Sequence, residues 1–313
     1  MKILITGTSG FIGKNLISRL RYSDVEVWQI GCNLSQSPPD DKIIHIDLAD
    51  QAAMRAAGDN VPLQFDACIH LSGQTDIAKS LDNPAGDING NIISIINLLS
   101  ILRFKKFIYI STGSVYEGQK GMVCHERSIS PTIPYAISKY AGELYVRSFH
   151  KIQNNPESYT ILRLFNPYGP FENSQRLLPR LIRQFGIDKC PDFNIKGTGK
   201  GLIDPVYVQD TVEALVKVLY SDVHNQEIDI CSGEPVTIEE LVYTTASFFE
   251  IEPHVGFFGH SNEEITYYGN PSIQKKLIGF KPQISLRRGI EKYYKFLING
   301  VRNEDTGSGS ISS

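Results

Sequence analysis

The chain has 313 residues, with 31 Lys and Arg against 34 Asp and Glu, and the resulting net charge of -3 argues against a nucleic-acid partner. Its five cysteines show no C-x-x-C spacing and its seven histidines no H-E-x-x-H pattern, so we expect neither a disulfide framework nor a metal site. The first residues read as a core strand rather than a signal peptide, and no apolar run reaches the length of a membrane span. We therefore expect a cytoplasmic protein with no membrane partner.

A strand, a glycine turn and a helix open the chain. Lys2–Thr6 is a short apolar strand, and Phe11–Leu20 has the pattern of a helix. In a turn that binds a dinucleotide, Gly7 makes the tight bend, Gly10 lets the backbone approach the pyrophosphate, and Gly13 lets the helix pack on the strand. This placement predicts a nucleotide cofactor at the N-terminus of the helix, where free N–H groups face the phosphates. The alternative is a purely structural glycine turn.

Apolar β-type runs alternate with helical patterns along the rest of the first half. The further candidate strands are Val25–Ile30, Lys42–Ile46, Ala67–Leu71, Lys106–Ser111 and Thr160–Phe165. This alternation is typical of a parallel sheet that helices cover on both faces. We predict an α/β fold in which a Rossmann-type, doubly wound parallel sheet occupies residues 1–165 and is completed by parts of about 202–232.

The second half has a less regular pattern. A loop rich in Pro, Gly and Asn (166–174) precedes a helix at about Leu177–Phe185 and a strand near Phe193–Lys196. We expect residues 166–300 to form a smaller, mixed α/β lobe that binds substrate. Residues 303–313 are rich in Gly and Ser and lack apolar periodicity, so we expect a disordered tail.

Three side chains are candidates for proton transfer. Tyr135 and Lys139 are four residues apart in a helical segment and so share one face of it. A lysine close to the Tyr135 hydroxyl would lower its pKa and make it a usable general acid or base near neutral pH. Thr112 follows a buried-type strand at its carboxyl end, where α/β sheets bind ligands. The alternative is a structural threonine beside an ordinary surface helix.

With these motifs in this order, the chain resembles the extended short-chain dehydrogenase/reductases of the nucleotide-sugar epimerase/dehydratase group, from Lys2 to about Leu297. The resemblance implies NAD(P)-dependent chemistry and a catalytic triad of Thr112, Tyr135 and Lys139. The cofactor-binding positions that it implies are Gly7, Ser9, Gly10, Phe11, Ile12, Gly13, Gly31, Asn33, Asp47, Leu48, Leu71, Ser72, Gly73, Asn91, Ile110, Tyr135, Lys139 and Phe165. The substrate-facing candidates are Gln74, Thr112, Gly113, Ser114, Tyr135, Asn166 and Arg176.

Departures from the family pattern narrow the reaction. The family's dehydratases resemble one another in placing Asp-Glu directly after the catalytic threonine, where this chain has Gly113 and Ser114. Neither residue can transfer a proton, so we do not expect dehydration, and Ser114 also counts against the related decarboxylases. Reduction of a keto sugar and epimerisation through a transient ketone remain.

The end of the second strand bears on the choice of cofactor. Gly31 stands where NAD-preferring members of the family have an acid that binds the ribose hydroxyls. An adenosine 2′-phosphate would meet no repulsion there, although no Arg or Lys follows before Lys42 to pair with it. Asn33 and Ser35 offer only moderate binding to that phosphate. NADP(H) is therefore favoured over NAD(H).

Substrate binding departs from the family as well. Ile203 replaces one of the two arginines that grip the pyrophosphate, and residues 255–270 contain no arginine for the other. Arg176, which follows the loop after Asn166, is the first choice for a replacement, with Arg180, Lys196 and Lys200 as other candidates. The alternative is that Arg176 is an ordinary surface arginine.

The segment Asn91–Leu102 is apolar on all sides and needs burial on all sides. Pairing with the helix after Tyr135 in a second copy would supply it through Tyr140, Leu144, Tyr145 and Phe149, so we expect a homodimer through a helix bundle. The alternative is deep burial within one monomer.

The leading hypothesis is an NADP(H)-dependent reductase of a nucleotide-linked 4-keto (deoxy)sugar, in which Tyr135 protonates the carbonyl oxygen while a hydride arrives at its carbon. A nucleotide-sugar 4-epimerase that retains NAD would use the same residues. The missing arginines favour a third possibility, reduction of a small carbonyl metabolite. A nucleotide-sensing scaffold of the same fold is a non-enzymatic fourth.

Overall fold

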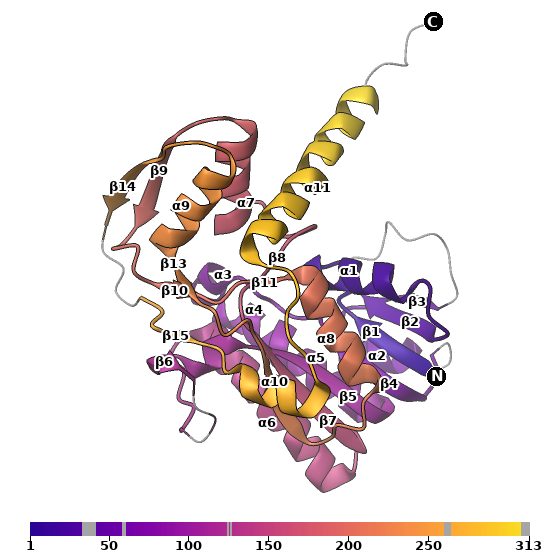
Figure 1. The fold of residues 1–313 in the computed structure, drawn as a ribbon. Coiled ribbons are helices and arrows are strands. Elements are labelled where there is room, and N and C mark those ends of the chain that lie inside the picture. The colour runs from indigo at the N-terminus through magenta and orange to yellow at the C-terminus, as the bar shows by residue number, and fades with distance from the viewer. Residues whose placement is uncertain (33–41, 58–60, 124, 126, 260–263, 308–313) are drawn as a thin grey trace, which may run out of the picture.

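A seven-stranded parallel sheet forms the centre of the computed structural model, which describes residues 1–313 except 33–41, 58–60, 124, 126, 260–263 and 308–313 (Figure 1). Its strand order is β12-β7-β5-β4-β1-β2-β3, and all neighbouring strands are parallel. The strands are β1 (Lys2–Thr6), β2 (Glu26–Gly31), β3 (Ile43–His45), β4 (Gln64–His70), β5 (Arg103–Thr112), β7 (Ser158–Leu164) and β12 (Gln226–Ile230). The predicted Rossmann-type fold is confirmed.

Both faces of the sheet are buried, which explains the continuous apolar runs of its strands. In β1, Ile3 and Ile5 belong to the hydrophobic cluster on one face and Leu4 to the cluster on the other. The first face is covered by α1 (Phe11–Leu20), α8 (Val208–Tyr220) and α10 (Pro271–Ile278). The second is covered by α2 (Gln51–Ala56), α5 (Ser94–Ile101) and α6 (Pro134–Gln153).

Short helices connect β4 to α5. They are α3 (Ile77–Asp82), α4 (Pro84–Ile88) and a π-helix over Asn89–Ile93. The carboxylate of Asp76 caps α3 by accepting the Lys79 N–H, and the amide oxygen of Asn83 caps α4 by accepting the Gly86 N–H. These caps fix the path of the chain from the end of β4 to the start of α5.

A separate hydrophobic cluster lies in the second half of the chain and includes Phe185, Phe193, Leu241 and Tyr293. Its elements are α7 (Leu177–Leu181), a π-helix over Ile182–Ile187, β9 (Asp192–Lys196), α9 (Ile238–Phe248), β14 (His254–Phe258) and α11 (Leu286–Gly307). The predicted helix and strand at residues 177–185 and 193–196 are confirmed. Residues 303–307, for which the sequence predicts disorder, continue α11, and residues 308–313 lie outside the described part of the chain.

Short strand pairs join distant segments around the carboxyl edge of the sheet. They are β6 (Gly121–Met122) with β15 (Tyr267–Tyr268), β8 (Pro167–Tyr168) with β11 (Val206–Tyr207), and β10 (Leu202–Ile203) with β13 (Val236–Thr237). The buried carboxylate of Asp204 accepts the backbone N–H groups of Ser232, Gly233 and Gly269 and so holds three loops together.

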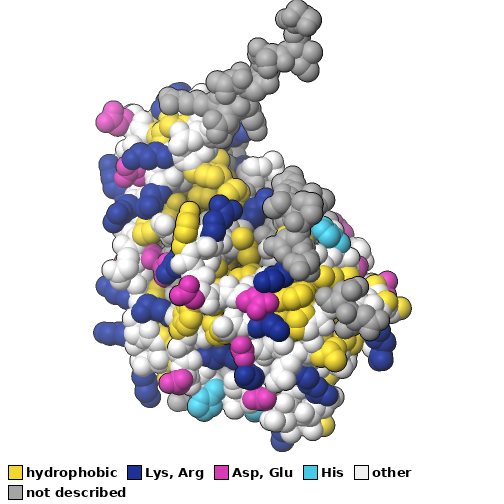
Figure 2. Space-filling model, turned by 90° about the vertical axis from the view of Figure 1, so that its right-hand side faces the viewer, with side chains coloured by type: hydrophobic (Ala, Val, Ile, Leu, Met, Phe, Trp, Pro, Cys, Tyr) yellow, Lys and Arg dark blue, Asp and Glu magenta, His cyan; other side chains and the backbone are white. Residues whose placement is uncertain are grey.

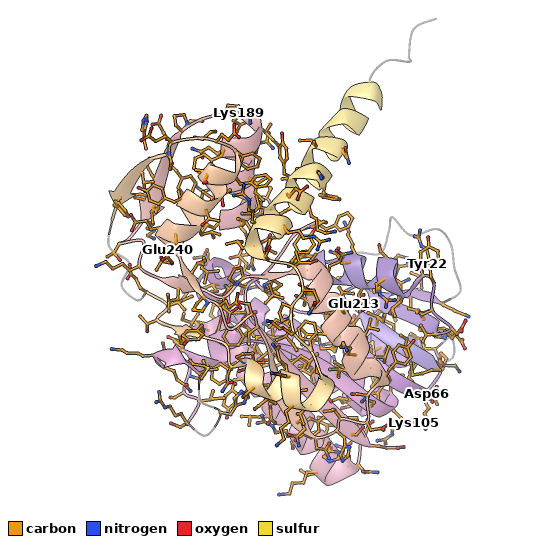
Figure 3. The ribbon with its side chains drawn as sticks, in the orientation of Figure 1. Tyr22, Asp66, Lys105, Lys189, Glu213 and Glu240 are labelled. Carbon is orange, nitrogen blue, oxygen red and sulfur yellow. The ribbon has the colours of Figure 1, made fainter. Side chains whose placement is uncertain are left out.

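The surface mixes charges of both signs. On the face shown in Figure 2, Lys and Arg side chains are interspersed with Asp and Glu around hydrophobic ones. At the amino edge of the sheet, the Lys105 ammonium lies 2.7 Å from the Asp66 carboxylate, and Figure 3 labels these two residues next to each other. Across the described ranges, no helix is long and apolar enough to cross a membrane, and no His, Cys, Asp and Glu side chains gather in a group of three or more that could hold a metal ion.

Candidate active site

The glycine turn after β1 is packed so closely that two of its glycines are required by contacts alone. Gly7 has φ +71°, and a Cβ on it would lie 2.7 Å from the carbonyl carbon of Leu71. A Cβ on Gly13 would lie 2.2 Å from the carbonyl oxygen of Gly7. The turn therefore presses against the segment after β4, and α1 presses against the turn.

Gly10 is less tightly packed than these two glycines, since no atom of the described residues comes within 3 Å of a Cβ built on it. A Cβ there would meet only the Gly7 oxygen, at 3.3 Å. Gly10 is the N-cap of α1, no side chain caps the helix, and Phe11 and Ile12 begin it half-buried, with Ser9 exposed before them. Uncapped N–H groups next to an open glycine suit the pyrophosphate of a dinucleotide, so the residues present fit such a cofactor.

A buried histidine fastens this turn to the neighbouring strand. The Thr6 hydroxyl accepts the Ser72 N–H at 3.1 Å and lies 2.9 Å from Nδ1 of His70. Burial lowers the pKa of His70 to about 3, so the ring that forms this hydrogen bond is neutral. Leu71, Ser72 and Gly73, which the sequence assigns to the cofactor, leave β4 at this point.

The adenine end of the expected cofactor site lies at β2 and β3. Gly31 ends β2, and its carbonyl oxygen accepts the Ile46 N–H. After β3, the amide of Asn97 donates to the carbonyl oxygens of Leu48 and Ala49, which anchors the segment that Asp47 begins. Asn33 lies outside the described residues.

The three predicted catalytic residues meet at the carboxyl edge of the sheet. Thr112 ends β5, and Tyr135 and Lys139 lie in the first two turns of α6. The Tyr135 hydroxyl forms a hydrogen bond with the Thr112 side chain. The Lys139 ammonium donates to the Ile110 carbonyl oxygen at 2.5 Å and lies 4.4 Å from the centre of the Tyr109 ring.

The electrostatics of this group differ from the sequence-based expectation. Burial raises the pKa of the Tyr135 hydroxyl, and the groups that lower it are Thr112, by its hydrogen bond, and Arg176, by its charge. The Lys139 ammonium donates to the Ile110 carbonyl oxygen of the neighbouring strand. Burial also lowers the pKa of Lys139 to about 8, against the opposing effect of the Glu143 and Asp87 carboxylates.

Asn91 connects the loop after β4 to the catalytic helix. Its buried amide donates to the Gln74 carbonyl oxygen at 3.1 Å, to the Asp87 carboxylate at 3.1 Å and to the Ser138 hydroxyl at 3.0 Å. The Gln74 side chain, a predicted substrate contact, donates to the Asp76 carbonyl oxygen and the Asp87 carboxylate and accepts the Asp76 N–H. Its polar atoms are thus engaged within the loop itself.

The residues around Thr112 are packed on one another. A Cβ on Gly113 would lie 2.8 Å from the Phe165 ring, so the ring and the glycine fit together. Ser114 forms hydrogen bonds with Thr112 and with Tyr267 of β15. The sequence analysis does not predict Tyr267 as a site residue. The one feature that could have pointed to it is the Tyr267-Tyr268 pair within residues 255–270, the window that lacks the family's arginine.

Asn166 and Arg176 begin and end the loop that leads into the second half. Asn166 has φ +35°, and its side-chain oxygen accepts the Asp204 N–H at 3.2 Å. Arg176 is exposed, donates to the Thr75 carbonyl oxygen at 3.3 Å, and is close enough to Tyr135 to influence its pKa. Ile203, where the family has an arginine, packs against the hydrophobic cluster of the second half.

A cavity of about 730 Å³ opens immediately after Arg176, and Leu177, Arg180, Phe193 and Lys196 are among its lining residues. Between residues 3 and 231 the chain matches the model of the NAD dependent epimerase/dehydratase family. The chain belongs to this family.

Individual relatives in the family differ in reaction. The chain is 26% identical to the putative UDP-glucose 4-epimerase of Methanocaldococcus jannaschii, covering 96% of this chain and 99% of the relative. It is 27% identical to the GDP-6-deoxy-D-mannose reductase of Pseudomonas aeruginosa, covering 97% and 99%. Among solved structures, the UDP-glucuronic acid 4-epimerase of Bacillus cereus in complex with UDP-glucuronic acid and NAD superposes with a TM-score of 0.84, at 25% identity over 96% of this chain and 99% of that one.

Family membership makes this protein an NAD(P)-dependent oxidoreductase or epimerase, and the relatives named above are nucleotide-sugar enzymes. The catalytic geometry agrees, since a tyrosine, a threonine and a lysine lie together at the edge where the glycine turn lies. The relatives include both a reductase and epimerases, so the net reaction is a separate question.

Proposed function

We propose that this protein is an NADP(H)-dependent reductase of a nucleotide-linked 4-keto (deoxy)sugar. The observation that carries the proposal is the Tyr135–Thr112 hydroxyl pair, because it offers one transferable proton and neither of the two residues directly after Thr112 is an acid. Gly113 and Ser114 cannot eliminate water, which leaves hydride transfer at a sugar carbon as the chemistry for this site.

The cofactor would lie along the carboxyl edge of the sheet, where its nicotinamide supplies or accepts a hydride. Gly7, Gly10 and Gly13 would hold the pyrophosphate, and Asp47 and Leu48 the adenine. The nicotinamide side would lie between the segment 71–73, Ile110, Phe165 and Lys139, with Asn91 behind it. Gly31 presents no carboxylate to a 2′-phosphate, which supports NADP(H) over NAD(H).

In this mechanism Tyr135 donates its proton to the sugar carbonyl oxygen. Thr112, which is hydrogen-bonded to Tyr135, orients that oxygen, so both hydroxyls act on one atom. Lys139 contributes positive charge on the same helix, held in place by the Ile110 carbonyl oxygen. The charge of Arg176 favours the phenolate that forms when the proton leaves.

The nucleotide would extend from Arg176 into the second half of the chain. Arg176 would pair with the diphosphate, and residues 166–300 would form the substrate lobe around the cavity of about 730 Å³. Arg180 and Lys196 at the cavity wall add positive charge that suits a phosphorylated ligand.

We also propose a homodimer through α5 and α6. Leu144 and Tyr145 on α6 are 48% and 41% exposed, which is unusual for large apolar side chains on a helix of this core. Most of α5 is buried within the monomer, with Ile95, Leu98 and Leu99 at 0% exposure, so α6 would supply most of the contact. Sedimentation equilibrium of wild type and of Leu144→Glu tests it, and an unchanged mass for the variant would contradict it.

A 4-epimerase that retains NAD is the second candidate, favoured by the similarity to the epimerase of Methanocaldococcus jannaschii. Mass spectrometry of small molecules released from freshly purified protein separates the two candidates. Protein that releases tightly held NAD would favour the epimerase. Protein that exchanges NADPH freely and oxidises it with a nucleotide-linked 4-keto sugar would support the reductase, whereas oxidation only with small carbonyl compounds would overturn both.

A further inference from the structure

Three consecutive residues of β5 are hydrogen-bonded to α6. The Tyr109 hydroxyl donates to the Lys139 carbonyl oxygen at 3.3 Å, and the Lys139 ammonium donates to the Ile110 carbonyl oxygen at 2.5 Å. The Ser111 hydroxyl donates to Oε1 of Glu143 at 2.6 Å. Because Lys139 and Glu143 are one helical turn apart, these bonds fix the position of α6 along β5.

Glu143 is fully buried and has partners on both carboxylate oxygens. Nε of Arg163 donates to Oε1 at 2.9 Å, and Nη2 of Arg163 donates to Oε2 at 2.6 Å. Arg147 also donates to Oε2, at 3.3 Å, from the solvent side of the helix. A bidentate pair of this kind is directional as well as strong, so it holds the Glu143 carboxylate in one orientation toward Ser111.

Arg163 connects the Glu143 carboxylate to Tyr116 and, through it, to Asp229. This residue of β7 is 3% exposed, and its Nη1 donates to the Tyr116 hydroxyl at 2.7 Å. The Tyr116 hydroxyl in turn donates to the Asp229 carboxylate at 2.9 Å. The network therefore joins β5, α6, β7 and β12 through buried charged groups, none of which takes part in the proposed proton transfer.

This network lies directly behind the catalytic residues. Ser111 immediately precedes Thr112, and Glu143 is two turns after Tyr135 on the same helix. The contact between the Thr112 and Tyr135 hydroxyls is thus made by two elements whose relative position the Ser111–Glu143 bond determines. Buried ion pairs often add little net stability, which makes a role in defining geometry the more informative account of this pair.

We propose that Ser111, Glu143 and Arg163 are positioning residues for catalysis, because the Ser111–Glu143 hydrogen bond, oriented by Arg163, sets the separation of the Thr112 and Tyr135 hydroxyls. The inference rests on the proposed function in taking Tyr135 as the proton donor. In this proposal the three residues act on Thr112 and Tyr135 through the backbone of β5 and α6, and they do not themselves contact substrate or cofactor.

The test is Ser111→Ala, which removes one hydroxyl and leaves the Glu143–Arg163 ion pair intact, so that the variant folds. Arg147→Ala is the matched control, since it also removes a partner of Glu143 but has no link to β5. We expect kcat to fall about 10- to 100-fold in Ser111→Ala, the order of loss that a displacement near 1 Å causes. The KM and Kd for the nicotinamide cofactor should stay within about twofold, and Ser111→Thr should restore most of kcat. A Ser111→Ala enzyme that is only less heat-stable, with wild-type kcat, would overturn the inference.

A second measurement needs no substrate. In protein labelled with 3-fluorotyrosine, the fluorine resonance of Tyr135 is identified by its loss in Tyr135→Phe, and its titration gives the pKa of that hydroxyl. The pKa should rise in Ser111→Ala, because the hydrogen bond from Thr112 lowers it, and should be unchanged in Arg147→Ala, where Thr112, Asp87 and Arg176 act as in wild type. If wild type turns over no nucleotide sugar, the proposed function fails, and an identical titration in all forms would separately overturn the positioning role.

Discussion

A hydrogen bond of 2.9 Å joins the Thr6 hydroxyl at the end of β1 to the His70 ring at the end of β4. The ring is fully buried between Phe107 and Tyr109, and the same hydroxyl accepts the Ser72 N–H. Two neighbouring strands therefore end in a fixed relation at the point where the sheet order reverses, which is where doubly wound folds bind their ligands.

The neutral state of His70 predicts a pH dependence of stability. Burial holds its folded pKa at about 3, below the unfolded value, so the unfolded chain binds one more proton between these values. The stabilisation is complete above about pH 6.5 and is lost as pH falls toward 3, by about 1 kcal/mol between pH 6.5 and 5.5. Urea unfolding at both pH values should show this loss in wild type and not in His70→Gln. Equal losses in both proteins would assign the effect to carboxyl groups.

Tyr135→Phe removes the transferable proton and little else. General acid–base catalysis contributes about 10²- to 10⁴-fold, so turnover should fall by that order while the affinity for cofactor stays the same. Steady-state kinetics together with a fluorescence titration of NADPH measure both quantities. Wild-type turnover of the true substrate in this variant would exclude Tyr135 as the acid.

Gly10→Val should abolish cofactor binding with little harm to the fold, because a Cβ on Gly10 would meet only the Gly7 carbonyl oxygen, at 3.3 Å. Gly13→Val is the informative contrast, since its Cβ would lie 2.2 Å from the Gly7 oxygen and should destabilise the turn itself. Fluorescence titration with NADPH and NADH, next to a thermal melt, distinguishes the two effects. Undiminished binding to folded Gly10→Val would place the dinucleotide elsewhere.

Gly31→Asp should shift the cofactor preference from NADP(H) toward NAD(H). A carboxylate at the end of β2 would repel a 2′-phosphate and accept hydrogen bonds from a 2′-hydroxyl. A charge-assisted hydrogen bond is worth about 1.5–3 kcal/mol, so the ratio of kcat/KM for the two cofactors should move at least about tenfold. If wild type already prefers NADH strongly, the cofactor proposal is wrong.

Arg176→Ala should raise KM for a nucleotide sugar about tenfold or more, with a smaller change in cofactor affinity. Arg183 is the matched control, because its side chain is 70% exposed and its ion-pair partner is Asp188, at 4.0 Å. Small and equal effects of Arg176→Ala and Arg183→Ala would show that Arg176 is an ordinary surface arginine with no role in substrate binding, and would favour a small carbonyl substrate.

The features that the sequence predicts well are those set by local contacts. The roles of Gly7 and Gly13 follow from a turn of a few residues, and the bounds of β1 and α1 agree with the predicted ones at every residue. β4 and β5 each begin three residues before the predicted start, because the pairing of the two strands begins ahead of the apolar run, and β4 ends at His70, one residue before the predicted end.

The features that the sequence does not predict depend on which distant residues meet. The choice of Arg163 as the partner of Glu143, twenty residues apart, is made by the packing of β7 beside β5. The hydrogen bond of the Lys139 ammonium to the Ile110 carbonyl oxygen depends on a rotamer that spacing along a helix leaves open. In the same way, Gln74 has the chemistry of a substrate contact but folds back on Asp76.

The fit between Gly113 and Phe165 limits how this site can change during evolution. A Cβ at residue 113 would lie 2.8 to 2.9 Å from three atoms of the Phe165 ring, so an aspartate cannot enter there while the ring keeps its place. Phe165 is itself held at 4% exposure, against Val115, Tyr116 and Cys231. Acquiring the acid pair of a dehydratase would thus require changes in the segments after both β5 and β7.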